Sequence, residues 1–471
     1  MHKNLHPGRA SLPTRAMKSP LGKLIARPWL DVCVLYFLKS WFFPLSRLWA
    51  AARIAEGDVD KFIEHVPLSK PGPRKRKQIA KALYQFDRQR LKAFSTEQLW
   101  NTYFFGPEDV APERLPIVED MRLDNRTAYN TTRKLFRPLK RLVQTSVQVS
   151  PPTPEEVTKR YGRDGHKLDA LFALPNTLPK VDVSRSIPTE YGRDYWIRFA
   201  SSSIEMNDIV TARVFEPQDA THPPTLIFGH GICVEADHYH QLLDEITDLV
   251  KMGIRVIKPE APWHGRRVLP GHYGGEQLLS AIPLSMIEFM AAQHKDWASM
   301  IQWSRETSTG AIAIGGSSLG AQTAKLIAAK ARDWPEHLRP DALFIVAHCA
   351  ELAETALDSS LSDIWNIGRA MKDQGWTHAL EKDWLEKLDA THPPCMSGDN
   401  IISITGLRDT VTPARSAAQQ LDTWSVPDAN RFVYQRGHFS IPLGIIHDIA
   451  PLQKLADILH AQSPKKNRDA S

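Results

Sequence analysis

A serine with one glycine two positions before it and another two positions after it lies just beyond an apolar run. The run is Ala311–Ile314, and a helical pattern begins at Ala321. A turn that presents a nucleophilic serine between a strand and a helix needs small residues at those two positions, because strand and helix approach closely there. Gly316 and Gly320 meet this need around Ser318. The spacing therefore predicts that Ser318 is a nucleophile.

Ser317 is the neighbouring alternative, since it also lies in the turn. Its own flanking positions are Gly315 and Leu319. A leucine fits the close approach of strand and helix less well than a glycine does. The pattern thus favours Ser318 over Ser317.

An acid and a histidine follow the serine, each after a later strand-like run. Asp409 follows Ile401–Thr405, and His438 follows Phe432–Tyr434. A serine hydroxyl is a weak nucleophile until a neutral imidazole takes its proton, and a carboxylate fixes the tautomer of that imidazole. An isolated Asp or His in a loop is usually a turn residue or a surface group. Here, however, Ser318, Asp409 and His438 each follow a strand-like run of their own. Asp409 and His438 are thus candidates for the acid and the base that would activate Ser318.

A further turn, Phe228-Gly229-His230-Gly231-Ile232-Cys233, ends another apolar run. Together with the serine turn and the order Ser, Asp, His, it resembles the α/β-hydrolase superfamily, in its branch of serine esterases and lipases with dienelactone-hydrolase-like proteins. The resemblance covers about residues 190–462. It implies a catalytic triad of Ser318 as nucleophile, His438 as base and Asp409 as acid. It also implies an oxyanion hole formed by the backbone N–H groups of Ile232 and Leu319, with Cys233 as a rival to Ile232. It also implies that His230 orients the loop.

The motif Pro259–Arg267 resembles the loop that follows the adjoining strand in this superfamily, often written P-D-x-P-G-H-G. Glu260 and Trp263 depart from that pattern. The resemblance implies a structural role for His264. We expect three side chains to line the substrate pocket: Cys233, Trp263 and Arg266.

Several histidines lie close to these motifs in the sequence: His230, His238, His240, His264 and His272. A metal site is imaginable, but no ligand spacing typical of one links them. The resemblance implies no cofactor. We expect neither a metal nor a cofactor.

Strand-like runs alternate with helical patterns from residue 191 onward. The strand-like runs are Trp196–Ala200, Ala212–Phe215, Thr225–Phe228, Ile254–Ile257, Ala311–Ile314, Leu343–Ala347, Ile401–Thr405 and Phe432–Tyr434. The helical patterns are Asp237–Met252, Glu276–Trp303, Ala321–Ala331, Pro413–Leu421 and Ile441–Ala461. This alternation predicts an α/β fold with a mostly parallel, doubly wound sheet covered by helices on both faces.

A helical insertion is expected at about residues 350–399, between two of the strand-like runs. In the superfamily that the chain resembles, an insertion at this point forms a cap over the serine. The insertion carries Trp365, Trp376 and Trp384. These rings either form an apolar wall for the substrate or bury the cap against the core.

Residues 1–150 differ in character from the rest of the chain. The whole chain has a formal net charge of +6, and this part holds a large excess of Lys and Arg over Asp and Glu. We expect a basic, mostly helical amino-terminal extension, an irregular connector at 151–190, a catalytic domain at 191–462 and a polar tail at 463–471. Helical patterns in the extension are Leu21–Ala52, with a break near Pro44, and Pro71–Phe94. Residues from about 100 to 190 show no sustained hydrophobic period of the kind that indicates a helix or a strand.

The segment Leu21–Ala52 is apolar and aromatic with basic flanks. It is typical either of a helix docked on the catalytic domain or of an interfacial helix, through which residues 1–52 would contact an anionic membrane. The longest apolar run, Val32–Leu38, is shorter than the roughly 18 residues that span a bilayer. Four widely separated cysteines favour a reducing compartment. We expect a cytoplasmic protein, with peripheral contact at the membrane left open.

The residue types indicate hydrolysis of a small-molecule carboxylic ester or thioester through an acyl-enzyme intermediate. The same triad serves a peptidase or an acyltransferase, because it does not choose the leaving group or the acceptor. A non-catalytic lipid-binding or scaffold protein on a hydrolase fold is the alternative from another class. No zinc spacing, helix-turn-helix or RNA-recognition signature accompanies the basic charge, and we expect no nucleic-acid partner.

Overall fold

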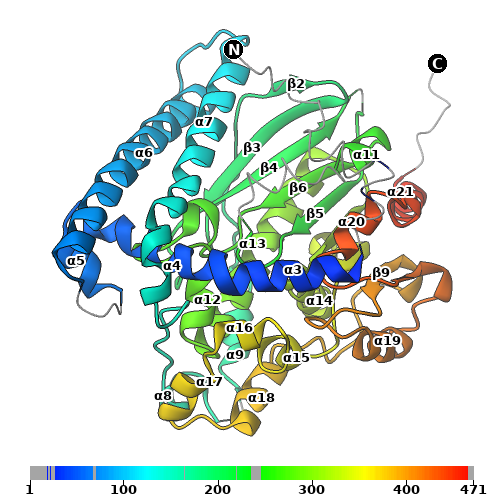
Figure 1. Ribbon diagram of the computed structural model, residues 1–471. Coiled ribbons are helices and arrows are strands. Elements are labelled where there is room, and N and C mark those ends of the chain that lie inside the picture. The colour runs from blue at the N-terminus through cyan, green and yellow to red at the C-terminus, as the bar shows by residue number, and fades with distance from the viewer. Residues whose placement is uncertain are drawn as a thin grey trace.

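A mixed β-sheet runs through the centre of the computed structural model (Figure 1). The structure describes Ser19, Gly22 and residues 27–66, 71–163, 165–218, 220–234 and 246–464. Within these residues the sheet has ten strands, in the order β1-β3-β4-β6-β5-β7-β8-β9-β10, and β2 pairs with β3. The strands are β1 Asp182–Val183, β2 Ile187–Thr189, β3 Gly192–Ala200, β4 Ile209–Pro217, β5 Thr225–Gly229, β6 Arg255–Pro259, β7 Ile312–Ser317, β8 Ala342–Val346, β9 Ile401–Gly406 and β10 Arg431–Tyr434.

The strands from β5 to β10 are parallel, and β1 to β4 form an antiparallel edge. In the parallel part Ile227 pairs with Ile314, and Ile314 with Leu343. β4 runs antiparallel to β6 and joins the two parts. The parallel strands are almost continuously apolar, as expected of strands that are covered on both faces.

Helices cover both faces of the sheet because alternate residues of each strand point to opposite sides. Ile227 and Ile314 pack with α13 Leu284–Thr307 and α14 Leu319–Lys330. Leu226 and Phe344 pack on the other face. That face is covered by α11 Ile246–Lys251, α20 Ile441–Ile445 and α21 Ala450–Gln462. α19 Ala414–Thr423 lies on the face of α13 and α14, because its Leu421 belongs to their core cluster. The predicted doubly wound sheet is confirmed.

Two predicted helices are interrupted. The pattern Glu276–Trp303 forms α12 Glu276–Ser280 and then α13, because Pro283 lacks the N–H that a continuous helix needs. The pattern Ile441–Ala461 divides into α20 and α21. Of the predicted helix Asp237–Met252, the structure describes only the end, α11, and the rest lies outside the described residues.

From residue 28 the amino-terminal extension forms one long helical rod, coloured dark blue in Figure 1. It consists of α3 Pro28–Phe37, a π-helical turn η1 Leu38–Phe42 and α4 Phe43–Ala55. The break expected near Pro44 is absent. The wider turn accommodates a proline without an N–H, and the N–H of Phe43 donates to the carbonyl of Leu38 instead. α5 Val59–Glu64 and α6 Pro73–Phe105 follow.

The stretch from residue 100 to 190 is more regular than expected. It contains the end of α6, then α7 Arg114–Thr131, the 3₁₀ helix η2 Thr132–Leu142, α8 Pro154–Tyr161 and α9 Leu168–Phe172. The start of α8 has a signal in the sequence, since Thr153 and Glu156 form a capping box. α6 and α7 lie side by side and pack through Trp100 and Val118 against Trp196 of β3.

The helical cap insertion is also present, coloured yellow in Figure 1. Its helices are α15 Leu352–Ala356, α16 Ser362–Trp365, α17 Gly368–Asp373 and α18 His378–Glu386. Short 3₁₀ turns complete the described structure: η3 Gly265–Arg267, η4 Ala331–Asp333, η5 Glu336–Leu338, η6 Gly398–Asn400 and η7 Asp428–Asn430. Among the helices described here, none combines the length and the apolarity needed to cross a bilayer.

Candidate active site

Ser318 lies on a strained turn between β7 and α14. Its backbone has φ 56° and ψ −115°, a conformation that side-chain-bearing residues rarely adopt. A Cβ on Gly316 would collide with the backbone of Gly320, and one on Gly320 would collide with the carbonyl group of Gly229. The two glycines that frame the serine are therefore required by the close approach of β5, β7 and α14.

The three residues predicted from the sequence meet at the carboxyl ends of β7, β9 and β10. Ser318 Oγ lies 3.0 Å from Nε2 of His438, and Nδ1 of His438 lies 2.9 Å from Oδ2 of Asp409. A carboxylate only accepts, so Nδ1–H donates to Asp409 and Nε2 is left to accept from the serine hydroxyl. All three side chains are buried.

Asp409 is held as a carboxylate by several donors. Its Oδ1 accepts from the N–H groups of Val411 and Thr412, at 2.8 and 2.7 Å, and its Oδ2 accepts from the Thr412 hydroxyl at 2.7 Å. Burial by itself raises the pKa of Asp409, but the charge and hydrogen bond of His438 and the Thr412 donors outweigh it and lower that pKa. The acid therefore stays ionised beside the imidazole.

A serine on a strained strand-to-helix turn, at the edge of a doubly wound sheet, with Asp and His following it in that order, is the α/β-hydrolase arrangement. The chain has the α/β-hydrolase fold. Both the sheet topology and the joined side chains of Ser318, Asp409 and His438 support this assignment.

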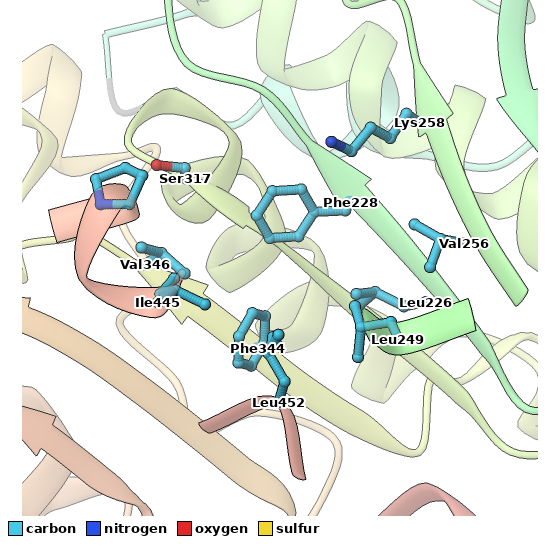
Figure 2. Close-up of a pocket in the computed structure, with 11 residues that line it drawn as sticks. Leu226, Phe228, Leu249, Val256, Lys258, Ser317, Phe344, Val346, Ile445 and Leu452 are labelled. Atoms are coloured by element: carbon cyan, nitrogen blue, oxygen red, sulfur yellow. The ribbon is translucent and has the colours of Figure 1, made fainter. Parts of the chain in front are cut away.

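Ser317, the alternative nucleophile, is placed differently within this α/β-hydrolase fold. It is the last residue of β7 and lines a small apolar pocket on the face covered by α11, α20 and α21, as well as a larger cavity that it shares with Ser318. Figure 2 shows its hydroxyl in that pocket with Phe228 and Val346 nearby. The hydrogen bond to His438 is made by Ser318.

The turn after β5 lies against the nucleophile. A Cβ on Gly231 would be 3.6 Å from Cβ of Ser318. The N–H of Cys233 already donates to Nε2 of His264 at 3.1 Å. Among the described residues, the N–H of Ile232 has no such acceptor, and the N–H of Leu319 is the first of α14 and has none within its helix. The geometry favours Ile232 over its rival Cys233.

Two histidine rings hold this turn against the loop after β6. Nδ1 of His264 contacts the carbonyl of Pro262 at 2.8 Å, and its Nε2 accepts from Cys233. Burial, together with His230, lowers the pKa of His264 to about 3, so the ring stays neutral and can accept. Nε2 of His230 accepts from the N–H of Ala261 at 3.2 Å. His238 and His240 lie outside the described residues.

A cavity of about 490 Å³ opens beside Ser318. His438, Ile232 and Cys233 contribute to its wall, and Cys233 is thus placed as predicted. A large part of the wall comes from the amino-terminal extension: Val34, Phe37, Leu38, Phe42 and Phe43. Sequence reasoning missed these residues because nothing in the sequence links residues 34–43 to a serine at position 318.

A second, much smaller cavity of about 30 Å³ lies on another side of Ser318. It is lined by cap residues, including Leu361 and Trp365, and by Leu319. The other two cap tryptophans have packing roles. Nε1 of Trp376 donates to the carbonyl of Pro152 at 2.6 Å, and Trp384 is buried in the main core cluster. Trp365 therefore fits the explanation in which the rings form a wall for the substrate. Trp376 and Trp384 fit the explanation in which they bury the cap against the core.

Two predicted pocket residues do not line either cavity. Trp263 has φ 59° and is buried against Phe289. The guanidinium of Arg266 bonds to Glu260 at 2.5 Å and to Glu97 of α6 at 2.6 Å. Glu260, where the family pattern has Asp, is thus a partner for Arg266. The prediction of pocket roles for Trp263 and Arg266 is wrong, because these ion pairs and this packing point both side chains elsewhere.

Asp31 is a further site residue that the sequence reasoning missed. Its carboxylate accepts from the N–H of Phe439 at 2.6 Å and from the hydroxyl of Ser440 at 2.7 Å. A Cβ on Gly437 would collide with this carboxylate. Helix α3 thereby holds the loop that carries His438. The available signal was that Asp31 is the only acid among the first 55 residues.

No family model matches this chain, and no curated protein matches it in sequence. Solved structures similar to it include acetyl xylan esterase 1 from Thermoanaerobacterium sp. JW/SL YS485, with 15% identity, 66% of this chain and 96% of that chain covered, and a TM-score of 0.43. An S-formylglutathione hydrolase from Agrobacterium tumefaciens has 14% identity, with 59% and 99% covered and a TM-score of 0.39. An esterase from Pyrobaculum calidifontis has 16% identity, with 65% and 94% covered and a TM-score of 0.35. These similarities are distant, and the fold assignment rests on this chain's own topology.

Proposed function

We propose that this protein is a serine hydrolase that cleaves a carboxylic ester or thioester through an acyl-enzyme intermediate. The observation that carries the proposal is the continuous hydrogen-bonded chain from Ser318 Oγ through His438 to Asp409. A buried chain of this kind is the arrangement that activates a hydroxyl for acyl transfer.

In the proposed first half-reaction, Ser318 Oγ attacks the carbonyl carbon while Nε2 of His438 takes its proton. The N–H groups of Ile232 and Leu319 stabilise the oxyanion of the tetrahedral intermediate, an interaction commonly worth several kcal/mol of barrier. His438 then gives its proton to the leaving alcohol or thiol, and the acyl group stays on Ser318. Asp409 stabilises the imidazolium throughout.

In the second half-reaction, water attacks the acyl-enzyme with His438 again as the base. The carbonyl–Oγ bond breaks, Ser318 recovers its proton from His438, and the carboxylic acid leaves. None of these steps needs a metal or a cofactor. The same acyl-enzyme passes its acyl group to another acceptor in an acyltransferase, and an amide substrate would make the protein a peptidase.

The two cavities suggest the shape of the ester. One half of the substrate is expected in the cavity of about 490 Å³, whose wall is mainly apolar, and the other in the cavity of about 30 Å³. The proposed substrate therefore has one bulky apolar half and one small half. A non-catalytic scaffold is disfavoured, since it has no use for a joined triad on a strained turn.

The test is labelling with a fluorophosphonate probe, which reacts with an activated serine. Wild type is expected to label, Ser318→Ala not to label, and the control Ser317→Ala to keep most of the labelling. Equal labelling of Ser318→Ala and wild type would sink the proposal. A series of p-nitrophenyl esters, with matched thioesters and anilides, then separates esterase from peptidase, and acyl chain length reports which half is small.

A further inference from the structure

The outward face of α3 is a row of exposed apolar side chains. Trp29, Val32, Tyr36 and Phe37 are 53%, 68%, 69% and 53% exposed. Their spacing places them along one side of the helix. Helices that are apolar all round are normally buried, whereas α3 packs its inner side, through Leu30, Leu35 and the buried Asp31, and leaves the outer side exposed. We call these four residues the α3 face.

The charges around the α3 face are basic. Arg27 and Lys39, at its two ends, are exposed. Arg137, also exposed, lies with its guanidinium 4.8 Å from the ring of Trp41 in the adjoining turn. Residues 1–26 add five basic residues to the chain and no acid: Lys3, Arg9, Arg15, Lys18 and Lys23. An apolar, aromatic face framed by cations is complementary to an anionic lipid surface, where rings lie at the headgroup level and each cation adds attraction.

The α3 face is continuous with the cavity beside Ser318. Phe37 belongs to both, since it is exposed and also lines the cavity, and Val34 and Leu38 of the same rod line it too. A surface that covers the α3 face therefore lies at the mouth of the cavity. Figure 1 shows α3 at the front of the molecule, without another described helix drawn over it.

We propose that the α3 face docks this protein on an anionic lipid bilayer and that apolar esters enter the cavity directly from the lipid. The occupant is lipid rather than a second copy, because the exposed cations Arg27, Lys39 and Arg137 beside the face would repel their own copies across a symmetric contact. Only the second half of the proposal, ester entry, rests on the proposed function.

Docking is tested apart from catalysis in the Ser318→Ala protein. Its sedimentation is measured with phosphatidylcholine vesicles that contain phosphatidylglycerol and with vesicles of phosphatidylcholine alone, at low and high salt. The expected result is binding to the anionic vesicles that weakens with salt. Adding Val32→Glu and Tyr36→Glu should weaken partitioning by more than about tenfold, because two carboxylates then face anionic headgroups.

The matched control is Phe94→Glu, which places a carboxylate on α6 at a residue that is 61% exposed. It should bind vesicles as the parent does. Melting temperatures show that all variants remain folded, since exposed positions tolerate such changes. Absence of vesicle binding, equal binding by the Val32→Glu/Tyr36→Glu protein, or a dimer in sedimentation velocity that this pair of substitutions dissociates would overturn the proposal.

Ester entry is tested in the protein that keeps Ser318. Turnover of a long-chain ester dissolved in anionic vesicles is compared with turnover of a short water-soluble ester. With Val32→Glu and Tyr36→Glu, the turnover of the long-chain ester relative to that of the short ester should fall at least about tenfold, as vesicle partitioning does. An unchanged ratio would contradict entry from the lipid. Absence of turnover on both esters, with vesicle binding intact, would instead count against the proposed function and leave docking standing.

Discussion

Asp31 connects the amino-terminal helix to the loop of the proposed base, across 408 positions of sequence to Phe439. Its two carboxylate oxygens accept from the Phe439 N–H and the Ser440 hydroxyl, immediately after His438, so the imidazole keeps its place between Ser318 and Asp409. Misplacement of a reacting group by about 1 Å is enough to cost roughly 100-fold in rate. Asp31 is thus a positioning residue rather than a catalytic one.

For this reason Asp31→Ala is predicted to lower kcat for a short soluble ester by roughly 10 to 100-fold, with a smaller change in KM. Asp31→Asn should recover part of the loss, since its amide oxygen still accepts from the Phe439 N–H. The control is Asp58→Ala, which removes a carboxylate that caps α5 in the same extension. Equal kcat in Asp31→Ala and the control would show that the contact does not position His438.

Residues whose chemistry depends on local sequence were within reach of sequence analysis. Ser318 and its two glycines form one turn, and Asp409 and His438 each follow a strand, so parallel strand ends place them together. Trp263 and Arg266 were misplaced because the orientation of each depends on contacts from other elements, Phe289 for one and Glu97 for the other. Such contacts leave no periodic trace in the sequence.

At the level of single elements, α13 carries a histidine whose protonation is linked to stability. His294 is buried and its Nε2 accepts from Nε1 of Trp334 at 3.1 Å. Burial, with a smaller effect from the charges of Lys330 and Lys295, lowers its pKa from 6.5 to about 3. Between these two values the unfolded chain binds a proton that the folded chain does not. The free energy of unfolding therefore decreases as the pH falls from about 6.5 towards 3.

His294→Gln is predicted to reduce the slope of the free energy of unfolding against pH by about 1.4 kcal/mol per pH unit below pH 6.5. This reduction corresponds to about one bound proton. The glutamine oxygen can still accept from Trp334. Denaturant unfolding at several pH values from 7.5 to 5 measures the slope. The control His337→Gln, at an exposed position near the same helix, should keep the wild-type slope. A slope in His294→Gln as steep as wild type would refute the assignment.

The elements themselves were predicted where their pattern is long and apolar. The parallel strands were found because burial on both faces makes them continuously apolar. The break expected near Pro44 was wrong because one π-helical turn accommodates a proline. α7 was missed because its exposed apolar residues, such as Ile117, obscure the helical period that its buried side would show.

For the molecule as a whole, the amino-terminal extension contains a buried part and an exposed part that the sequence pattern did not separate. The explanations of a docked helix and an interfacial helix were treated as alternatives for Leu21–Ala52. In the structure α4 is docked, with Leu48 and Trp49 buried in the main core, whereas α3 keeps an exposed apolar face. Only tertiary contacts distinguish the two halves of one continuous rod.

The docked half is tied to the catalytic domain by a buried ion pair. Nη1 of Arg47 lies 2.7 Å from Oε1 of Glu276 in α12, and both side chains are at most 1% exposed. Nη2 of Arg47 also donates to the carbonyl of Gly271 at 2.8 Å. If Arg47 were removed, the carboxylate of Glu276 would stay buried with neither water nor a counterion beside it. The extension and the hydrolase fold should consequently unfold as one cooperative unit.

We predict that Arg47→Met destabilises the whole protein by about 3 to 5 kcal/mol, because Glu276 is then buried without its partner. Tryptophan fluorescence and hydrolase activity should be lost together at a lower denaturant concentration than in wild type. Adding Glu276→Gln should restore part of the loss, because the buried unpaired charge is then removed. The amide oxygen replaces only one of the two carboxylate oxygens, which now accept separately from the N–H groups of Gln148 and Tyr273. Lys61→Met, which removes one partner of the exposed pair Lys61–Glu56, should leave the midpoint unchanged. If Arg47→Met instead produced two separate transitions, with activity surviving the first, the extension would be an independent appendage and its part in the cavity wall dispensable.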